Sequence, residues 1–119
     1  MTKILVVDDS ATSRLLLRAH MPKTGDYQVV EASDLDGALA QAREHRPALV
    51  FLDYNMPGRN GAEIARELRA AGIDAVLYLL TANTQQGVIN AALEAGIQGV
   101  LEKPITADKL AQVLRDAGL

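Results

Sequence analysis

The sequence predicts an α/β fold in which five strands alternate with five helices and form one parallel sheet covered by helices on both faces. Short apolar runs alternate with segments whose apolar residues recur at helical spacing. The runs are continuously apolar, which is typical of strands that are buried on both faces. Right-handed crossovers leave few arrangements of such a doubly wound sheet, and the strand order 2-1-3-4-5 is the expected one.

The first two units are marked by polar residues that can begin a helix directly after each strand. The apolar run at residues 4–7 leads to Asp9 and Ser10, either of which can cap a helix over residues 11–21. The run at residues 27–32 precedes Ser33 and Asp34, the candidate caps of a second helix. One face of that helix carries apolar residues at positions i, i+3, i+4 and i+7, namely Leu35, Ala38, Leu39 and Ala42.

The remaining units follow the same pattern, and glycines mark the ends of two helices. Strands are expected at residues 48–52, 75–80 and 99–101. The helices that follow them are expected to begin near Asn60, Gln85 and Thr106. Gly72 and Gly96 end the first two of these helices, because glycine readily adopts the left-handed conformation found at helix ends.

The composition is that of one globular domain, which we expect to span residues 1–119. Hydrophobic residues make up 49% and charged residues 23% of the chain, a balance typical of water-soluble proteins. The net charge of −3 gives no general attraction to nucleic acid, and the absence of cysteine excludes disulfides and thiolate metal sites. The sequence begins without a signal-peptide pattern and has no apolar run near the ~20 residues of a membrane span, so a cytoplasmic location is expected.

Charged and hydroxyl side chains follow four of the expected strands. Asp8 and Asp9 follow the first strand, Asp53 the third, Thr81 the fourth and Lys103 the fifth. Open parallel sheets place their sites beyond the carboxyl ends of the strands, and the expected order makes the first and third strands neighbours. We therefore expect these side chains to converge on one crevice.

The expected crevice holds more negative than positive charge. Three carboxylates repel one another, and the single ammonium of Lys103 cannot balance them. Mg²⁺ suits such a site, because it prefers oxygen ligands and usually keeps several waters and a phosphate oxygen. A carboxylate can also act as a nucleophile and form an aspartyl phosphate. Phosphoryl transfer mainly needs positioning and charge neutralisation, to which Thr81 and Lys103 can contribute.

Four motifs make the chain resemble the receiver domains of bacterial two-component response regulators, whose flavodoxin-like fold has this strand order. The motifs are I-L-V-V-D-D-S at 4–10, V-F-L-D-Y-N-M-P-G-R-N-G at 50–61, L-L-T-A at 79–82 and L-E-K-P-I at 101–105. Each is weak by itself, but the four in this order, each at the end of an expected strand, are specific. The resemblance covers essentially the whole chain.

The resemblance implies which residues accept the phosphoryl group and bind the metal. Asp53 is the expected phosphoacceptor. Asp9, Asp53 and the backbone carbonyl of Asn55 are expected to ligate Mg²⁺. Asp8 is expected to act on the metal largely through water.

The resemblance also implies which residues contact the transferred group. Thr81, Lys103 and the backbone amide of Ala82 are expected to contact the phosphoryl oxygens. Lys103 and Pro104 are expected to be joined by a cis peptide bond. Asn55 and Asn83 flank the site and are expected to influence how fast the phosphoryl group is lost to water.

The partners implied by the resemblance are a phosphodonor and a downstream protein. The donor would be a sensor histidine kinase, a phosphotransfer protein or a small phosphodonor such as acetyl phosphate. Phosphorylation would switch the surface formed by the last two helices and the strand between them. Direct binding to nucleic acid or membrane is not expected. The chain is expected to be a stand-alone regulator or a receiver from a longer protein, monomeric or weakly dimeric when phosphorylated.

Four positions bear on the expected output and partner contacts. Many receivers carry an aromatic residue three positions before the lysine of the last strand, where this chain has Val100, and Ile105 stands where Phe is frequent. Phosphorylation is still expected, because Val100 is not one of the reacting groups, but the usual switch between the threonine and the aromatic ring is not. Arg14 and Arg18 are expected on an exposed helix face, where a partner contact is possible.

Two other functions stay open at the level of sequence. A receiver-like module that only binds partners, without phosphorylation, is compatible with Val100 but not favoured by the complete set of acids, Thr81 and Lys103. A phosphatase or phosphotransferase resembling the haloacid-dehalogenase family usually has a second acid two residues after its nucleophile, where this chain has Asn55. We therefore expect a domain that phosphorylates and dephosphorylates itself and turns over no external metabolic substrate.

Overall fold

The computed structural model describes residues 1–56, 58–82 and 85–119, and within them five strands and five helices alternate. The strands are β1 (Thr2–Val7), β2 (Tyr27–Ala32), β3 (Leu49–Asp53), β4 (Val76–Thr81) and β5 (Gly99–Glu102). The helices are α1 (Ala11–His20), α2 (Leu35–His45), α3 (Gly61–Ala70), α4 (Gln86–Glu94) and α5 (Ala107–Asp116). The predicted order of elements is confirmed. No helix of the described residues is long and apolar enough to cross a bilayer.

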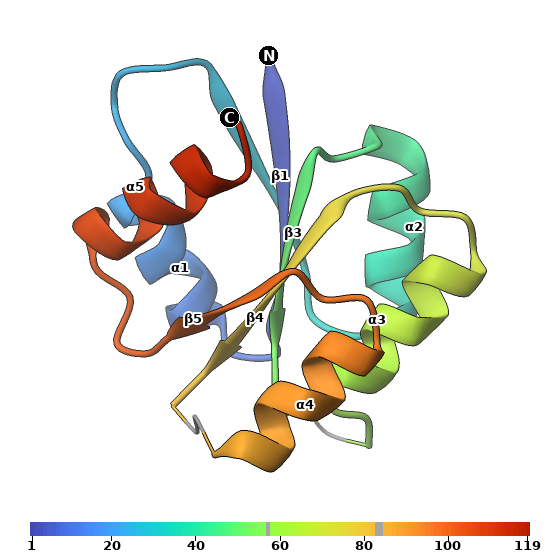
Figure 1. The fold of residues 1–119 in the computed structure, drawn as a ribbon. Helices are drawn as coiled ribbons and strands as arrows, with labels where there is room; N and C mark the ends of the chain where they lie inside the picture. The colour runs from blue at the N-terminus through green and yellow to red at the C-terminus, as the bar shows by residue number, and fades with distance from the viewer. Residues whose placement is uncertain (57, 83–84) are drawn as a thin grey trace.

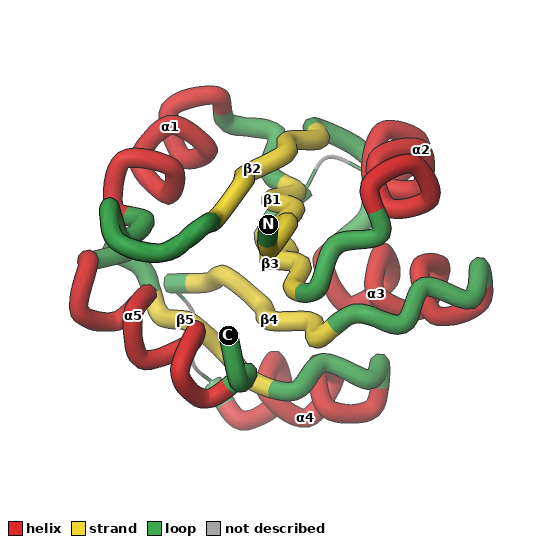
Figure 2. Tube along the Cα trace, turned by 90° about the horizontal axis from the view of Figure 1, so that it is seen from above, coloured by secondary structure: helices red, strands yellow, loops and turns green. Residues whose placement is uncertain are grey.

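The five strands form one parallel sheet in the order β2-β1-β3-β4-β5, which confirms the predicted fold class and topology. Helices α1 and α5 cover one face of the sheet, and α2, α3 and α4 cover the other (Figure 2). Because every strand runs in the same direction, their carboxyl ends lie along one edge of the sheet, near the bottom of Figure 1. The loops that leave this edge carry the residues with candidate functions.

The sheet is buried on both faces, which explains why its central strands are continuously apolar. In β1, Leu5 and Val7 pack into the layer under α2, α3 and α4. Ile4 and Val6 of the same strand pack into the layer under α1 and α5. All four side chains are fully buried. Every position of the central strands therefore needs an apolar residue until the chain reaches the polar carboxyl edge.

Polar caps fix where the helices begin near this edge. Ser10, rather than Asp9, caps α1, and Asp34, rather than Ser33, caps α2, each by accepting a backbone amide three residues ahead. Asn60 caps α3 in the same way, and the Glu63 carboxylate accepts the Asn60 amide in return. Such caps satisfy amides that have no partner inside the helix, so they hold each helix start in a defined place beside the strand ends.

Candidate functional site

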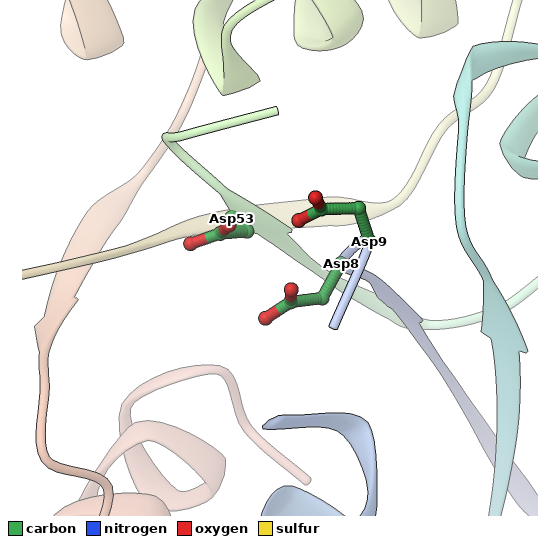
Figure 3. Close-up of side chains that lie close together, drawn as sticks. All are labelled: Asp8, Asp9 and Asp53. Atoms are coloured by element: carbon green, nitrogen blue, oxygen red, sulfur yellow. The ribbon is translucent and has the colours of Figure 1, made fainter. Parts of the chain in front are cut away.

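Three carboxylates meet where β1 and β3 end at the carboxyl edge of the sheet (Figure 3). Asp8, Asp9 and Asp53 each contribute one carboxylate oxygen, and these oxygens lie within 4.8 Å of one another. Asp8 and Asp53 are buried, at 1% and 5% exposure, whereas Asp9 is exposed. The direct pairing of β1 with β3 brings the acids together, as the predicted strand order implied.

Lys103 reaches the acids from the loop after β5. Its Nζ donates a hydrogen bond to Oδ1 of Asp53 at 2.8 Å and lies 3.6 Å from Oδ2 of Asp8. Its backbone amide donates to the Thr81 carbonyl at 3.0 Å, which extends the pairing of β4 with β5 by one residue. The peptide between Lys103 and Pro104 is cis, as expected. The lysine is thus placed by the end of the sheet and reaches into the acidic crevice.

The charges of this crevice do not balance. Burial raises the pKa of Asp53; the hydrogen bond from Lys103 opposes the rise, and the charges of Asp8 and Asp9 add to it. Burial lowers the pKa of Lys103, but the hydrogen bond and charge of Asp53 and the charge of Asp8 outweigh this and raise it overall. Negative charge contributes to both shifts, because it favours the ammonium of Lys103 and adds to the effect of burial on Asp53. A further cation would offset this negative charge.

Within the described residues, one buried oxygen of the crevice accepts no hydrogen bond and has only the ion-pair contact with Lys103 at 3.6 Å. Oδ1 of Asp8 accepts the backbone amide of Ser10 at 2.9 Å, but Oδ2 is buried and accepts no hydrogen bond there. A buried polar atom without a partner is costly, so native structures usually supply a protein group, a water or an ion. The donor atoms of Asp8, Asp9 and Asp53 are all carboxylate oxygens, which fit a hard divalent cation such as Mg²⁺. These three residues can hold the metal that the sequence suggested.

The threonine of the fourth strand lies beside the same crevice. Thr81 is the last residue of β4, and its side chain is buried at 1% exposure. In the sheet it is paired with Glu102, the residue before Lys103, and its neighbour Leu80 is paired with Asp53. The structure therefore brings Thr81 between the strand of the aspartate and the strand of the lysine, as the sequence predicted.

The remaining predicted residues lie in the loops that leave the sheet at this edge. Asn55 follows β3 by two residues and is exposed. Ala82 directly follows β4 and is also exposed. Asn83, which was expected to flank the site, lies outside the described residues. The metal-ligating and phosphate-binding roles expected of Asn55 and Ala82 stay predictions.

Arg14 forms a contact next to Asp8 and Asp9 that the sequence did not predict. Arg14 was expected on an exposed helix face, but its side chain is only 18% exposed. Its Nη1 donates to the backbone carbonyl of Asp8 at 2.6 Å, and its Nε donates to Oε1 of Glu31 at 2.8 Å. Arg18 is exposed at 51%, as expected, although it also pairs with Glu31. The prediction failed for Arg14 because the sequence alone does not show that β2 presents a carboxylate beside α1.

The two positions that depart from the receiver pattern both have apolar surroundings. Val100 of β5 is partly buried against the apolar layer under α2, α3 and α4. Ile105 is partly buried against the layer under α1 and α5, so the expected packing role is kept. Neither side chain is among the charged groups of the crevice.

Comparisons with known proteins agree with this geometry. A family model described as the response regulator receiver domain matches residues 4–115. Chemotaxis protein CheY of Bacillus subtilis (strain 168) is 30% identical over 112 residues, which cover 94% of this chain and 93% of that protein. Virulence sensor protein BvgS of Bordetella bronchiseptica is 38% identical over 122 residues, which cover 97% of this chain and 10% of that protein. The chain thus spans nearly all of one curated relative and a tenth of another.

Solved structures give the same result for the fold. The structure of Vibrio cholerae chemotaxis protein CheY4 has a TM-score of 0.90 and 28% identity, with 98% of each chain covered. The signal receiver domain of NarL from Mycobacterium tuberculosis has a TM-score of 0.87 and 30% identity, with 98% of this chain covered. With its strand order, its acidic crevice and a family match over residues 4–115, the chain belongs to the response regulator receiver domains of two-component systems.

Proposed function

We propose that the chain accepts a phosphoryl group on Asp53 in an Mg²⁺-dependent reaction and thereby switches its binding to a downstream protein. The observation that carries this proposal is the setting of the Asp53 carboxylate. It is buried, it accepts a hydrogen bond from Lys103, and it lies within 4.8 Å of two further acids whose charge the lysine does not balance. Such a site favours a divalent cation and a nucleophilic carboxylate together.

The proposed reaction transfers a phosphoryl group from a phosphohistidine or an acyl phosphate. A carboxylate oxygen of Asp53 forms a bond to phosphorus, and the bond from phosphorus to the donor nitrogen or oxygen breaks with its electron pair on the leaving group. Lys103, 2.8 Å from Asp53 before transfer, then neutralises a phosphoryl oxygen, and Thr81 donates a hydrogen bond. Bound Mg²⁺ supplies the remaining charge neutralisation. Attack by water later releases inorganic phosphate and restores Asp53, so the domain phosphorylates and dephosphorylates itself and turns over no external metabolic substrate.

The surface beside Lys103 supports a protein as phosphodonor, either a sensor histidine kinase or a phosphotransfer protein. Leu15 and Leu16 of α1 are 63% and 50% exposed. A groove of ≈ 170 Å³ runs from Leu16 to Lys103 and is lined by Ser13, Leu16, His20, Lys103, Pro104 and Ile105. Exposed apolar side chains next to a groove are common in protein-binding surfaces. A donor docked there would bring its phosphoryl group to the side of the crevice where Lys103 lies.

The output of the switch would pass through β4 and the neighbouring surface of α4, β5 and α5. A phosphoryl group adds about −1.5 to −2 charges and three acceptor oxygens next to the buried Thr81. Movement of Thr81 toward these oxygens would shift the end of β4 and thereby the neighbouring surface. Because Val100 carries no ring, this output would not use an aromatic side chain on β5.

Intact-mass spectrometry after incubation with phosphoramidate or acetyl phosphate tests the proposal. The wild-type protein is expected to gain one phosphoryl group only when Mg²⁺ is present. The Asp53→Asn variant is expected to gain none, whereas Asp108→Asn, which removes an exposed acid from α5, is expected to react as the wild type does. Equal labelling of Asp53→Asn would overturn the assignment of the phosphoacceptor.

A failure of labelling has its own diagnostic. Beryllofluoride binds aspartyl-phosphate sites and is not lost to hydrolysis. If the protein binds it in a Mg²⁺-dependent way but shows no added phosphoryl group, rapid dephosphorylation explains the missing mass increase. Absence of both labelling and beryllofluoride binding would favour the alternative function, a receiver-like module that binds partners without phosphorylation.

A further inference from the structure

The carboxylate of Asp9 has no side-chain contact that holds it in place among the residues that the structure describes. Within the described residues it forms no hydrogen bond or ion pair, and it is exposed. The position of the Asp9 backbone depends on the peptide that joins it to Asp8. The Asp8 amide donates to the Ala32 carbonyl at 3.0 Å, and the Asp8 carbonyl accepts from Arg14 Nη1 at 2.6 Å. The Arg14 guanidinium thus fixes the oxygen of the peptide from which Asp9 extends.

Arg14 is itself held in place by Glu31 of β2. Nε of Arg14 donates to Oε1 of Glu31 at 2.8 Å, and Arg18 donates to the other carboxylate oxygen. The Gln41 side chain donates to the Glu31 backbone carbonyl at 3.1 Å, which ties β2 to α2 at the same residue. Arg14 uses two different edges of its guanidinium for Glu31 and Asp8, which the single nitrogen of a lysine cannot reproduce in the same geometry.

We propose that Arg14 is a positioning residue of the metal site: held by Glu31, it fixes the peptide between Asp8 and Asp9 and so sets the spacing of the two carboxylates for Mg²⁺. This inference rests on the Mg²⁺ binding of the proposed function. Residues that orient metal ligands typically change metal affinity by about 10–100-fold when they are removed.

The charge of Arg14 alone predicts the opposite effect on Mg²⁺ affinity, so a measurement of that affinity distinguishes a positioning role from an effect of charge. Arg14 is a cation close to an acidic crevice, so loss of its charge alone would tighten Mg²⁺ binding. Arg18 provides the matched control, because it pairs with the same Glu31 but does not contact the Asp8 carbonyl. The effect of position can therefore be separated from the effect of charge by comparing the two arginines.

The test is a Mg²⁺ titration of the full chain by calorimetry, for the wild type, Arg14→Met and Arg18→Met. Arg14→Met is expected to raise the Mg²⁺ dissociation constant about 10-fold. Arg18→Met is expected to leave it unchanged or slightly lower. At saturating Mg²⁺, labelling of Arg14→Met by phosphoramidate is expected to return to nearly the wild-type rate, because Arg14 does not touch the reacting atoms.

A metal-free measurement accompanies the titration. The carbonyl carbon of Asp8 and the amide nitrogen of Asp9 are expected to shift in the NMR spectrum of Arg14→Met and to stay in place in Arg18→Met. If Arg14→Met does not fold, Glu31→Gln is used in its place, because this substitution weakens the contact that holds Arg14 but keeps the guanidinium. Its expected effect on Mg²⁺ affinity has the same direction and a smaller size.

The outcomes separate this inference from the proposed function. A wild type that binds Mg²⁺ and is phosphorylated, together with an Arg14→Met variant that binds Mg²⁺ as tightly or more tightly, overturns the positioning role alone. An equal loss of Mg²⁺ affinity in Arg14→Met and Arg18→Met also overturns it, because both substitutions would then act only by weakening the hold on Glu31. A wild type that binds no Mg²⁺ overturns both proposals.

Discussion

Nζ of Lys103 lies 2.8 Å from Oδ1 of Asp53 and 3.6 Å from Oδ2 of Asp8, so one ammonium joins two buried acids from different strands. Lys103→Met is expected to lower the free energy of unfolding of the metal-free protein by about 1.5–3 kcal/mol, the usual size of a hydrogen bond to a charged group. It is also expected to tighten Mg²⁺ binding, since the metal no longer competes with the ammonium.

Urea unfolding with and without Mg²⁺ measures both effects of Lys103→Met. Lys23→Met is a suitable control, because Lys23 is exposed and lies away from the crevice, between α1 and β2. A Lys103→Met protein as stable as the wild type, with unchanged stabilisation by Mg²⁺, would show that the ammonium does not balance the acids.

The raised pKa of Asp53 makes the stability of the metal-free protein depend on pH. A carboxyl group with a higher pKa in the folded state contributes most when it is protonated, and that contribution is lost as pH rises from the ordinary carboxyl range of about 4 through the folded pKa. Asp53→Asn is therefore expected to gain stability relative to the wild type as the pH rises through this window. Thermal unfolding of both proteins without metal at several pH values measures the difference.

Mg²⁺ is expected to reverse this pH effect, because a cation among the acids favours their charged forms. With Mg²⁺ present, the wild type should gain stability as Asp53 ionises, while Asp53→Asn should respond weakly. Asp108→Asn, an exposed acid on α5, is expected to follow the wild type in both conditions. The same pH profile for Asp53→Asn and wild type without metal would contradict the raised pKa.

Gly61, the first residue of α3, packs directly against the end of the strand that carries Asp53, the proposed phosphoacceptor. A Cβ atom at this position would lie 2.7 Å from the backbone oxygen of Asp53 and 2.7 Å from Cδ1 of Leu79. Gly61→Ala is therefore expected to destabilise the protein by about 1–3 kcal/mol, as overpacking usually does. Because the clash involves the Asp53 backbone, the rate of labelling by phosphoramidate should also fall.

Gly87 supplies the control for this substitution. It lies in α4, and a Cβ built on it meets no atom of the described residues within 4 Å beyond the adjacent residues and the backbone of its own helix. Gly87→Ala is expected to be neutral or to stabilise the protein by up to about 1 kcal/mol through helix propensity. Denaturant unfolding should show Gly61→Ala to be less stable than the wild type and Gly87→Ala to be at least as stable. A Gly61→Ala protein as stable as Gly87→Ala would show that the neighbouring atoms move aside at little cost.

Leu16 tests the proposed docking surface of the phosphodonor. Leu16→Ser is expected to slow labelling by a phosphohistidine-bearing phosphotransfer protein, because it removes an exposed apolar contact beside the groove at Lys103. Labelling by phosphoramidate should be unchanged, since the small donor needs no such surface. Leu93→Ser, which removes an exposed leucine from α4, is the matched control and should affect neither reaction. Equal slowing with both donors would assign Leu16 to the site itself.

The sequence was sufficient for the fold class, the strand order and the set of side chains at the carboxyl edge. Apolar periodicity determines which face of each element is buried, and parallel strands joined by right-handed crossovers leave few arrangements. Five side chains lie at or directly after the ends of strands, so any parallel sheet in this order brings them to one edge: Asp8, Asp9, Asp53, Thr81 and Lys103.

Tertiary structure decided what depends on contacts between elements distant in sequence. Three features arise from packing across the sheet: the buried Oδ2 of Asp8 that accepts no hydrogen bond within the described residues, the approach of α3 to β3 at Gly61, and the contact of Arg14 with Glu31. Local patterns report propensity and the burial of a face, but the partner that a long polar side chain reaches is set by the neighbouring element. Arg14 therefore looked exposed in the sequence, whereas the packing of α1 on β2 gives it two partners beside the acidic crevice.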